Sequence, residues 1–162
     1  FSRRSKEQKL EIMKDSRVGA FAVMALASLI LLKTAFFYEL FQMGTKAAIV
    51  LLFIPVLSRT AQTAVLCFFP YAKKDGIAVT FAQAAENRTG IIVMLIVYLS
   101  ILTGLIYYLA GINGLLIPFG LFLFTLFYYF SSKKNFGGIT GDITGAYLEL
   151  AEALMVGLLV LI

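Results

Sequence analysis

The chain has 162 residues, of which 60% are hydrophobic and only 14% are charged, and its formal net charge is +5. A soluble domain carries about a quarter charged residues, so these side chains are too few to cover a water-facing globule. The composition excludes a disordered chain, a collagen-like chain and an ordinary cytosolic enzyme, and it predicts a single integral membrane domain over residues 1–162. The chain has no His and one Cys, which also excludes histidine triads, histidine metal sites and internal disulfides.

Residues 1–17 are polar and basic, unlike the rest of the chain. A short helix is expected within residues 5–14, because Ser5 and Gln8 have the spacing of a capping box and the apolar Leu10 and Met13 can face the membrane. We therefore expect a cytoplasmic amphipathic segment over residues 1–17 and a membrane bundle over residues 18–162. The chain starts at Phe1 rather than Met, and its polar, basic start is not a signal peptide, so we expect a fragment whose beginning is missing.

Five apolar stretches approach the roughly 20 residues that a helix needs to cross a bilayer. The first runs from Val18 to about Leu32, or to Tyr38 if Lys33 extends its ammonium group to the interface; the others cover residues 47–69, 90–110, 115–130 and 143–162. Residues 111–114 form a tight turn, which makes the third and fourth spans antiparallel neighbours. The expected fold class is all-α: a polytopic transmembrane bundle of about five helices plus a short cytoplasmic N-terminal helix.

Basic residues predict the orientation of this bundle. Eleven of the 14 Lys and Arg fall before the first span or in the loops on that same side, whereas Lys33 and Lys46 fall on the other side and Arg59 lies within a span. The positive-inside rule then places residue 1 in the cytoplasm. Anionic membrane lipid beside basic loops accounts for the net charge, so no nucleic-acid partner is expected. The oligomeric state stays open.

Three polar segments share the predicted cytoplasmic face, namely residues 14–17, 71–76 and 136–145. They meet only if the bundle gathers the corresponding helix ends, which is a hypothesis at this point. The last segment is rich in glycine and opens a helix, an arrangement whose exposed amides favour phosphate. Asp142 at this helix start can hold Mg²⁺ between phosphate oxygens. In the alternative interpretation, the glycine spacings serve close packing and Asp142 is a plain helix cap.

Carboxylates also lie along the last predicted span. Asp142, Gly145, Glu149 and Glu152 are spaced by three, four and three residues and form one stripe of the helix. Arg59 reaches a depth similar to that of Glu152, so we expect Arg59 to pair with Glu152 or Glu149 across two helices. Such a pair either holds the bundle together or forms the charged wall of a substrate cavity, and both interpretations keep these side chains away from lipid.

The segments that carry a family resemblance are residues 10–21, Arg59, residues 70–76 and residues 137–146, followed by Glu149 and Glu152. In this order they resemble the cobalamin 5′-phosphate synthases, also called adenosylcobinamide-GDP ribazoletransferases. Members of that family are longer and carry an acidic motif just upstream of the segment that begins here. The resemblance therefore identifies a C-terminal part that contains only part of the family's active site.

The resemblance implies an enzyme that joins α-ribazole, or its 5′-phosphate, to adenosylcobinamide-GDP with release of GMP, late in cobalamin synthesis. It implies Mg²⁺ as the cofactor and the bacterial or archaeal cytoplasmic (inner) membrane as the location. Asp142 and Asp15 are the expected catalytic and metal-binding residues of this partial site. The expected phosphate-binding residues are Gly137, Gly138, Thr140, Gly141, Lys73, Lys74 and Arg17, and the expected cavity support is Arg59, Glu149 and Glu152.

Two other functions compete with this interpretation. A CDP-alcohol phosphotransferase performs comparable chemistry on lipid substrates and releases CMP, but its Asp-rich signature is absent from the sequence. A membrane subunit without catalytic activity, such as part of a transporter, needs charges that line a path across the membrane. The polar segments gather on one predicted face instead, which favours the enzyme.

Overall fold

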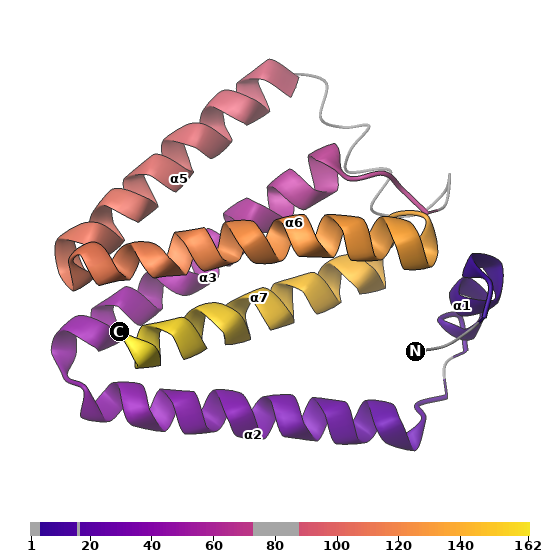
Figure 1. Ribbon diagram of the computed structural model, residues 1–162, viewed down its shortest axis with the longest axis horizontal. Coiled ribbons are helices and arrows are strands. Elements are labelled where there is room, and N and C mark those ends of the chain that lie inside the picture. Colours follow the sequence, from indigo (N-terminus) through magenta and orange to yellow (C-terminus); the bar gives the residue numbers. More distant parts are fainter. Residues whose placement is uncertain (1–3, 16, 73–87) are drawn as a thin grey trace.

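The computed structural model describes residues 4–15, 17–72 and 88–162. Figure 1 shows these residues as a bundle of helices: α1 (Lys6–Ile12), α2 (Ala20–Gln42), α3 (Thr45–Phe68), α5 (Arg88–Ala110), α6 (Leu116–Phe136) and α7 (Gly141–Leu161), with a 3₁₀ turn, η1, at Ile112–Leu115. Apart from one isolated bridge, the described ranges contain no β structure. Within them, five helices are long and apolar enough to cross a membrane. The predicted all-α class with about five spans is confirmed.

Two helices are longer than their apolar stretches. The first span does not end near Leu32, because α2 continues to Gln42, and this places Lys33 in the middle of a helix. The expectation that Lys33 lies on the far side of the membrane is therefore wrong; its side chain is only 17% exposed and pairs with carboxylates of α7. α6 also runs past Phe130, through two lysines that suit the negative end of the helix dipole.

The centre of the bundle is α7, which packs against α2, α3 and α6. In Figure 1 it runs between α2 and α6, and α3 passes behind α6. Tyr147 and Met155 of α7 are completely buried, as are Leu57 and Ser58 of α3. Lipid tails are as apolar as leucine, so such helices associate through close packing and polar contacts more than through the hydrophobic effect. The polar groups of α7 are therefore important for the arrangement of the bundle.

One end of the bundle gathers most of the polar segments. It carries α1, the first residues of α2 and α7, and the last residues of α3 and α6, and we call it the α1 end (Figure 1). At the opposite end, η1 connects α5 to α6 and makes these two helices antiparallel, as predicted. Gly111 has a φ of 67° there, a left-handed conformation that favours glycine.

Candidate functional site

A short backbone pairing joins two segments at the α1 end. The Ile139 amide donates to the Pro70 carbonyl at 2.8 Å, and the Ala72 amide donates to the Ile139 carbonyl at 3.0 Å. These bonds form a parallel bridge between Tyr71 and Ile139. The end of α3 is thus fixed beside the start of α7, which confirms that these two of the three polar segments meet. Lys73 and Lys74, which follow Ala72 in the sequence, lie outside the described residues.

Two glycines allow this close approach. Gly137 caps the C-terminus of α6 with a φ of 83°, in the left-handed region. A Cβ on Gly138 would lie 2.3 Å from the Pro70 carbonyl oxygen, so only glycine fits there. By contrast, a Cβ on Gly141 or Gly145 would have no neighbouring atom within 4 Å. The close-packing interpretation of the Gly137–Gly141 and Gly141–Gly145 spacings is therefore wrong, because the close approach in this segment is at Gly138.

The first turn of α7 is held by side chains on both sides. Thr140 is the N-cap, and its hydroxyl oxygen accepts the Ile143 amide at 3.3 Å. The Tyr128 hydroxyl of α6 donates to the Ile143 carbonyl at 2.7 Å. The alternative in which Asp142 is the cap is wrong, since Asp142 lies in the first helical turn and is exposed. A carboxylate is thus presented at a fixed helix N-terminus.

α1 brings the third polar segment to the same end. The Lys9 ammonium donates to the Asn135 side-chain oxygen of α6 at 3.1 Å, and Met13 packs against the hydrophobic core. Beyond α1, the Asp15 carboxylate accepts bonds from the Arg17 amide at 3.0 Å and from its guanidinium at 3.1 and 3.0 Å. The Arg17 side chain, followed by its backbone amide, lowers the pKa of Asp15. In this structure the two predicted site residues therefore bind each other.

A large open hollow lies against α1 at this end. Its volume is about 720 Å³, and its lining residues are Arg4, Gln8, Glu11, Ile12, Lys14 and Asp15. Among the described lining residues, Asp15 is the only predicted site residue, and none belongs to α7. The hollow therefore borders the Asp15 segment and does not include the turn at Asp142.

Arg59 does not form the predicted ion pair. Its guanidinium donates to the Gln62 side-chain oxygen at 3.2 Å, and the residue is exposed. The neighbouring Ser58 is completely buried instead, and its hydroxyl donates to a Glu152 oxygen at 2.9 Å. Consecutive residues of a helix point about 100° apart, so Arg59 has the expected depth but lies on the wrong face of α3. Cavity support by Arg59 has no basis in these contacts.

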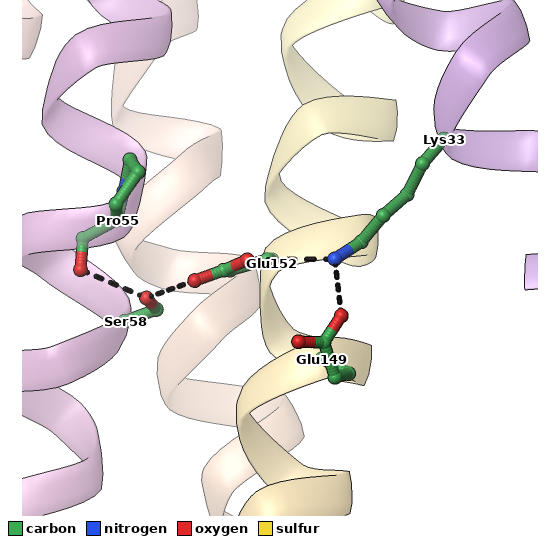
Figure 2. Close-up of polar contacts among 5 residues, drawn as sticks. All are labelled: Lys33, Pro55, Ser58, Glu149 and Glu152. Atoms are coloured by element: carbon green, nitrogen blue, oxygen red, sulfur yellow. Dashed lines mark hydrogen bonds and ion pairs between the residues drawn. The ribbon is translucent and has the colours of Figure 1, made fainter. Parts of the chain in front are cut away.

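The partner of both carboxylates is Lys33 of α2. Figure 2 shows its ammonium group between them, at 2.6 Å from a Glu149 oxygen and 3.4 Å from a Glu152 oxygen. With the hydrogen bond of Ser58, this network connects α2, α7 and α3. Sequence reasoning missed Lys33 and Ser58, although a lone charge within an apolar run is a signal for an intramembrane partner.

The described residues do not assemble a complete magnesium site. In the described part of the chain, no three His, Cys, Asp or Glu side chains lie close enough together to hold a metal ion. Asp142 offers one exposed carboxylate, whereas both oxygens of Asp15 are engaged by Arg17. The magnesium ion therefore stays a prediction.

Comparisons with known proteins agree with one another. A family model described as cobalamin-5-phosphate synthase matches residues 1–161. The chain is 35% identical over 162 residues to the adenosylcobinamide-GDP ribazoletransferase of Desulforamulus reducens, covering 99% of this chain and 62% of the relative. It is 37% identical over 153 residues to the protein of the same name from Clostridium botulinum (strain Kyoto), covering 94% and 59%.

The chain spans less than two thirds of these relatives, namely 62% of the first and 59% of the second. No solved structure matches the chain.

Proposed function

Because the chain belongs to the cobalamin-5-phosphate synthase family, we propose that its protein performs the transfer for which the relatives are named. A ribose hydroxyl of α-ribazole, or of its 5′-phosphate, attacks the cobinamide-linked phosphorus of adenosylcobinamide-GDP. A new oxygen–phosphorus bond forms, the bond from that phosphorus to the GMP oxygen breaks, and the hydroxyl proton is lost. The products are GMP and adenosylcobalamin, or its 5′-phosphate.

The observation that carries this proposal is the pairing of Tyr71 with Ile139. It holds the start of α7, with exposed Asp142 in its first turn, beside the segment that leads into Lys73 and Lys74. Phosphoryl transfer depends mainly on positioning and on neutralising charge. A helix N-terminus supplies amide donors for phosphate oxygens, and nearby lysines supply positive charge. In this proposal the two segments supply the kinds of group that hold a diphosphate.

Seven of the predicted residues then have a definite task in the proposal. Gly141 has no side chain over the helix start and leaves the first amides of α7 open to phosphate oxygens, whereas the Ile143 amide is already bound by the Thr140 cap. Lys73, Lys74 and Arg17 neutralise the diphosphate or the ribazole phosphate. Asp142 orients the attacking group, or contributes one ligand to Mg²⁺, which when bound neutralises phosphate charge. Asp15 fixes Arg17 through its three hydrogen bonds.

The proposed setting is the cytoplasmic membrane, with the α1 end inside the cell. Lys6, Lys14, Lys133 and Lys134 lie at this end and are exposed, whereas Lys46 begins α3 at the opposite end. This asymmetry follows the positive-inside rule. Lipid acyl chains would contact the exposed apolar side chains of α2, α5 and α6. A fluorescent protein fused to the N-terminus should therefore mature in the cytoplasm and fluoresce. A fusion without fluorescence would contradict the orientation.

The function is tested by offering the reconstituted protein two nucleotide-linked substrates together. Adenosylcobinamide-GDP and α-ribazole form one pair, and a CDP-alcohol with a lipid acceptor forms the other. The proposal expects GMP and a corrinoid product that contains ribazole, identified by mass spectrometry. Release of CMP alone would assign the protein to the CDP-alcohol phosphotransferases, and release of neither nucleotide would contradict the proposed transfer.

A further inference from the structure

Lys33 has no task in the reaction as proposed, yet it occupies a costly position. It is the fourteenth of the 23 residues of α2, near the middle of an apolar span, and its side chain is 17% exposed. Charged residues at this depth are expensive and usually serve a function. Its ammonium group contacts Glu149 and Glu152 of α7, and Glu152 also binds Ser58 of α3. One side chain thus joins the helices that lead to the proposed site.

Lys33 also marks the point where α2 and α7 part. Beyond it, Leu40 is 1% exposed, and the Phe36 ring lies 3.1 Å from where a Cβ of Gly157 would be. On the other side of Lys33, residues 20–32 include no buried residue. Figure 1 shows α2 and α7 separating toward the α1 end. The ion pairs are therefore the last polar contact between the two helices before they diverge.

Two parts of the proposed site lie on the two sides of this divergence. The Asp15–Arg17 pair precedes residues 20–32, the half of α2 that has no buried residue. Asp142 lies seven residues before Glu149 on α7. From Lys33 to Ala20 the helix is about 20 Å long, so a tilt of about 5° moves its end by roughly 2 Å. A displacement of about 1 Å can cost a factor of about 100 in rate when two reacting groups must be aligned.

We propose that Lys33 is a positioning residue for the transfer: its ion pairs with Glu149 and Glu152 set the angle between α2 and α7 and thereby the distance from Arg17 to Asp142. This inference rests on the proposed function. Lys33 does not touch the reacting groups, and it acts through the two carboxylates. Substrates still bind to each half of the site when the angle varies, but the halves are aligned less often, so kcat falls while KM changes little.

The test compares three variants of the membrane-reconstituted protein. Lys33→Met leaves two carboxylates without their cation and risks failure to fold. The triple variant Lys33→Met/Glu149→Gln/Glu152→Gln removes all three charges and keeps the side chains close to their original size. Lys33→Arg keeps the cation; its larger head group has room because Lys33 borders a cavity of about 240 Å³ between α2, α3 and α7.

Two readouts separate positioning from stability alone. The first is kcat and KM for GMP release. The second is the distance between spin labels on Phe21→Cys of α2 and Leu150→Cys of α7, in a background where Cys67 is replaced by Ser. Both labelled positions are exposed, with exposed fractions of 85% and 43%, and neither belongs to the proposed site.

The proposal expects the triple variant to remain folded, with a broadened label distance, a kcat lowered by about 10- to 100-fold and a KM within about threefold of the original. Lys33→Arg should restore most of the kcat and the narrow distance distribution. A triple variant with unchanged kcat would overturn the proposal, and so would a lowered kcat with an unchanged label distance. If the unaltered protein releases no GMP, the proposed function fails, whereas the label distances still decide whether Lys33 sets the helix angle.

Discussion

The Lys33 ammonium group lies 2.6 Å from the Glu149 carboxylate, although 116 residues separate the two in the sequence. This contact joins the first described membrane helix to the last one and leaves Glu152 to share the same cation. Because two carboxylates surround one ammonium group, the loss of Lys33 and the loss of a single carboxylate have different consequences. Loss of Lys33 removes the cation from both carboxylates, whereas loss of one carboxylate leaves the other ion pair in place.

Lys33→Met should lower the free energy of unfolding by about 1–3 kcal/mol, since it removes the cation from Glu152, whose side chain is 22% exposed, and from the more exposed Glu149. The measurement is reversible unfolding in mixed micelles, followed by far-ultraviolet circular dichroism.

Arg59→Met is the matched control, because Arg59 is an exposed cation whose hydrogen-bond partner is the neutral Gln62. Its effect should stay below about 0.5 kcal/mol, as for most surface substitutions. If both variants lost the same free energy of unfolding, the Lys33 network would be contradicted. The pairing of Arg59 with Glu152 or Glu149 that the sequence predicted would then be favoured.

Gly138→Ala should disrupt the pairing between α3 and α7. Its Cβ would lie 2.3 Å from the Pro70 carbonyl oxygen, and the backbone of Tyr71 is 2.7 Å away. We expect a loss of about 1–3 kcal/mol from this overpacking. Gly145→Ala is the control, because its Cβ would meet no atom within 4 Å and alanine suits a helix interior better. That variant should be more stable by roughly 0.5–1 kcal/mol, and a destabilised Gly145→Ala would indicate a neighbour at this face.

Thr140→Ala should destabilise the first turn of α7 by about 1 kcal/mol, because the Ile143 amide loses its capping oxygen. Thr140→Ser keeps that oxygen and should behave like the original residue. Hydrogen exchange at the first amides of α7 measures the effect directly. The same exchange rates in Thr140→Ala and Thr140→Ser would show that the hydroxyl does not cap the helix.

The Asp15–Arg17 pair predicts a dependence on pH at the acidic end of the scale. Hydrogen bonds from Arg17 lower the pKa of Asp15 in the folded protein, so the interaction is complete above the ordinary pKa of aspartate, about 4. It is lost as the pH falls through the lowered value, not as the pH rises. Carboxyl NMR of labelled Asp15 should give a midpoint below about 4, and Arg17→Gln should raise it. Identical midpoints in both proteins would contradict the pairing.

Apolar run lengths predicted the helical spans well, but they could not predict where α2 ends. A lysine within an apolar stretch is normally costly, so Lys33 was placed near the end of the first span. The carboxylates that neutralise it come from α7, more than 100 residues later in the sequence. A pairing between residues so far apart in the sequence cannot be predicted from the hydrophobicity of a short local segment.

The error at Arg59 was of a different kind and was avoidable. The buried residues of α3 recur every three or four positions, at Val50, Ile54, Leu57, Ala61 and Val65. Ser58 adjoins this stripe and Arg59 lies outside it, so the periodicity already favoured Ser58 as the residue facing α7. By contrast, the meeting of the segments around Tyr71 and Ile139 depends on how three helices pack. The sequence could only suggest this meeting, because both polar segments belong to the predicted cytoplasmic face.

The central claim is that the transfer takes place at the start of α7, and the most direct test is the turnover of Asp142→Asn. Its rate of GMP release from adenosylcobinamide-GDP and α-ribazole should fall by at least about 100-fold, as for loss of a group that orients a reacting partner, with an unchanged unfolding temperature. Glu39→Gln is the control, an equivalent carboxylate-to-amide change at an exposed position near the opposite end of α2. A rate for Asp142→Asn within about threefold of the Glu39→Gln rate would contradict the account, since such a difference corresponds to well under 1 kcal/mol.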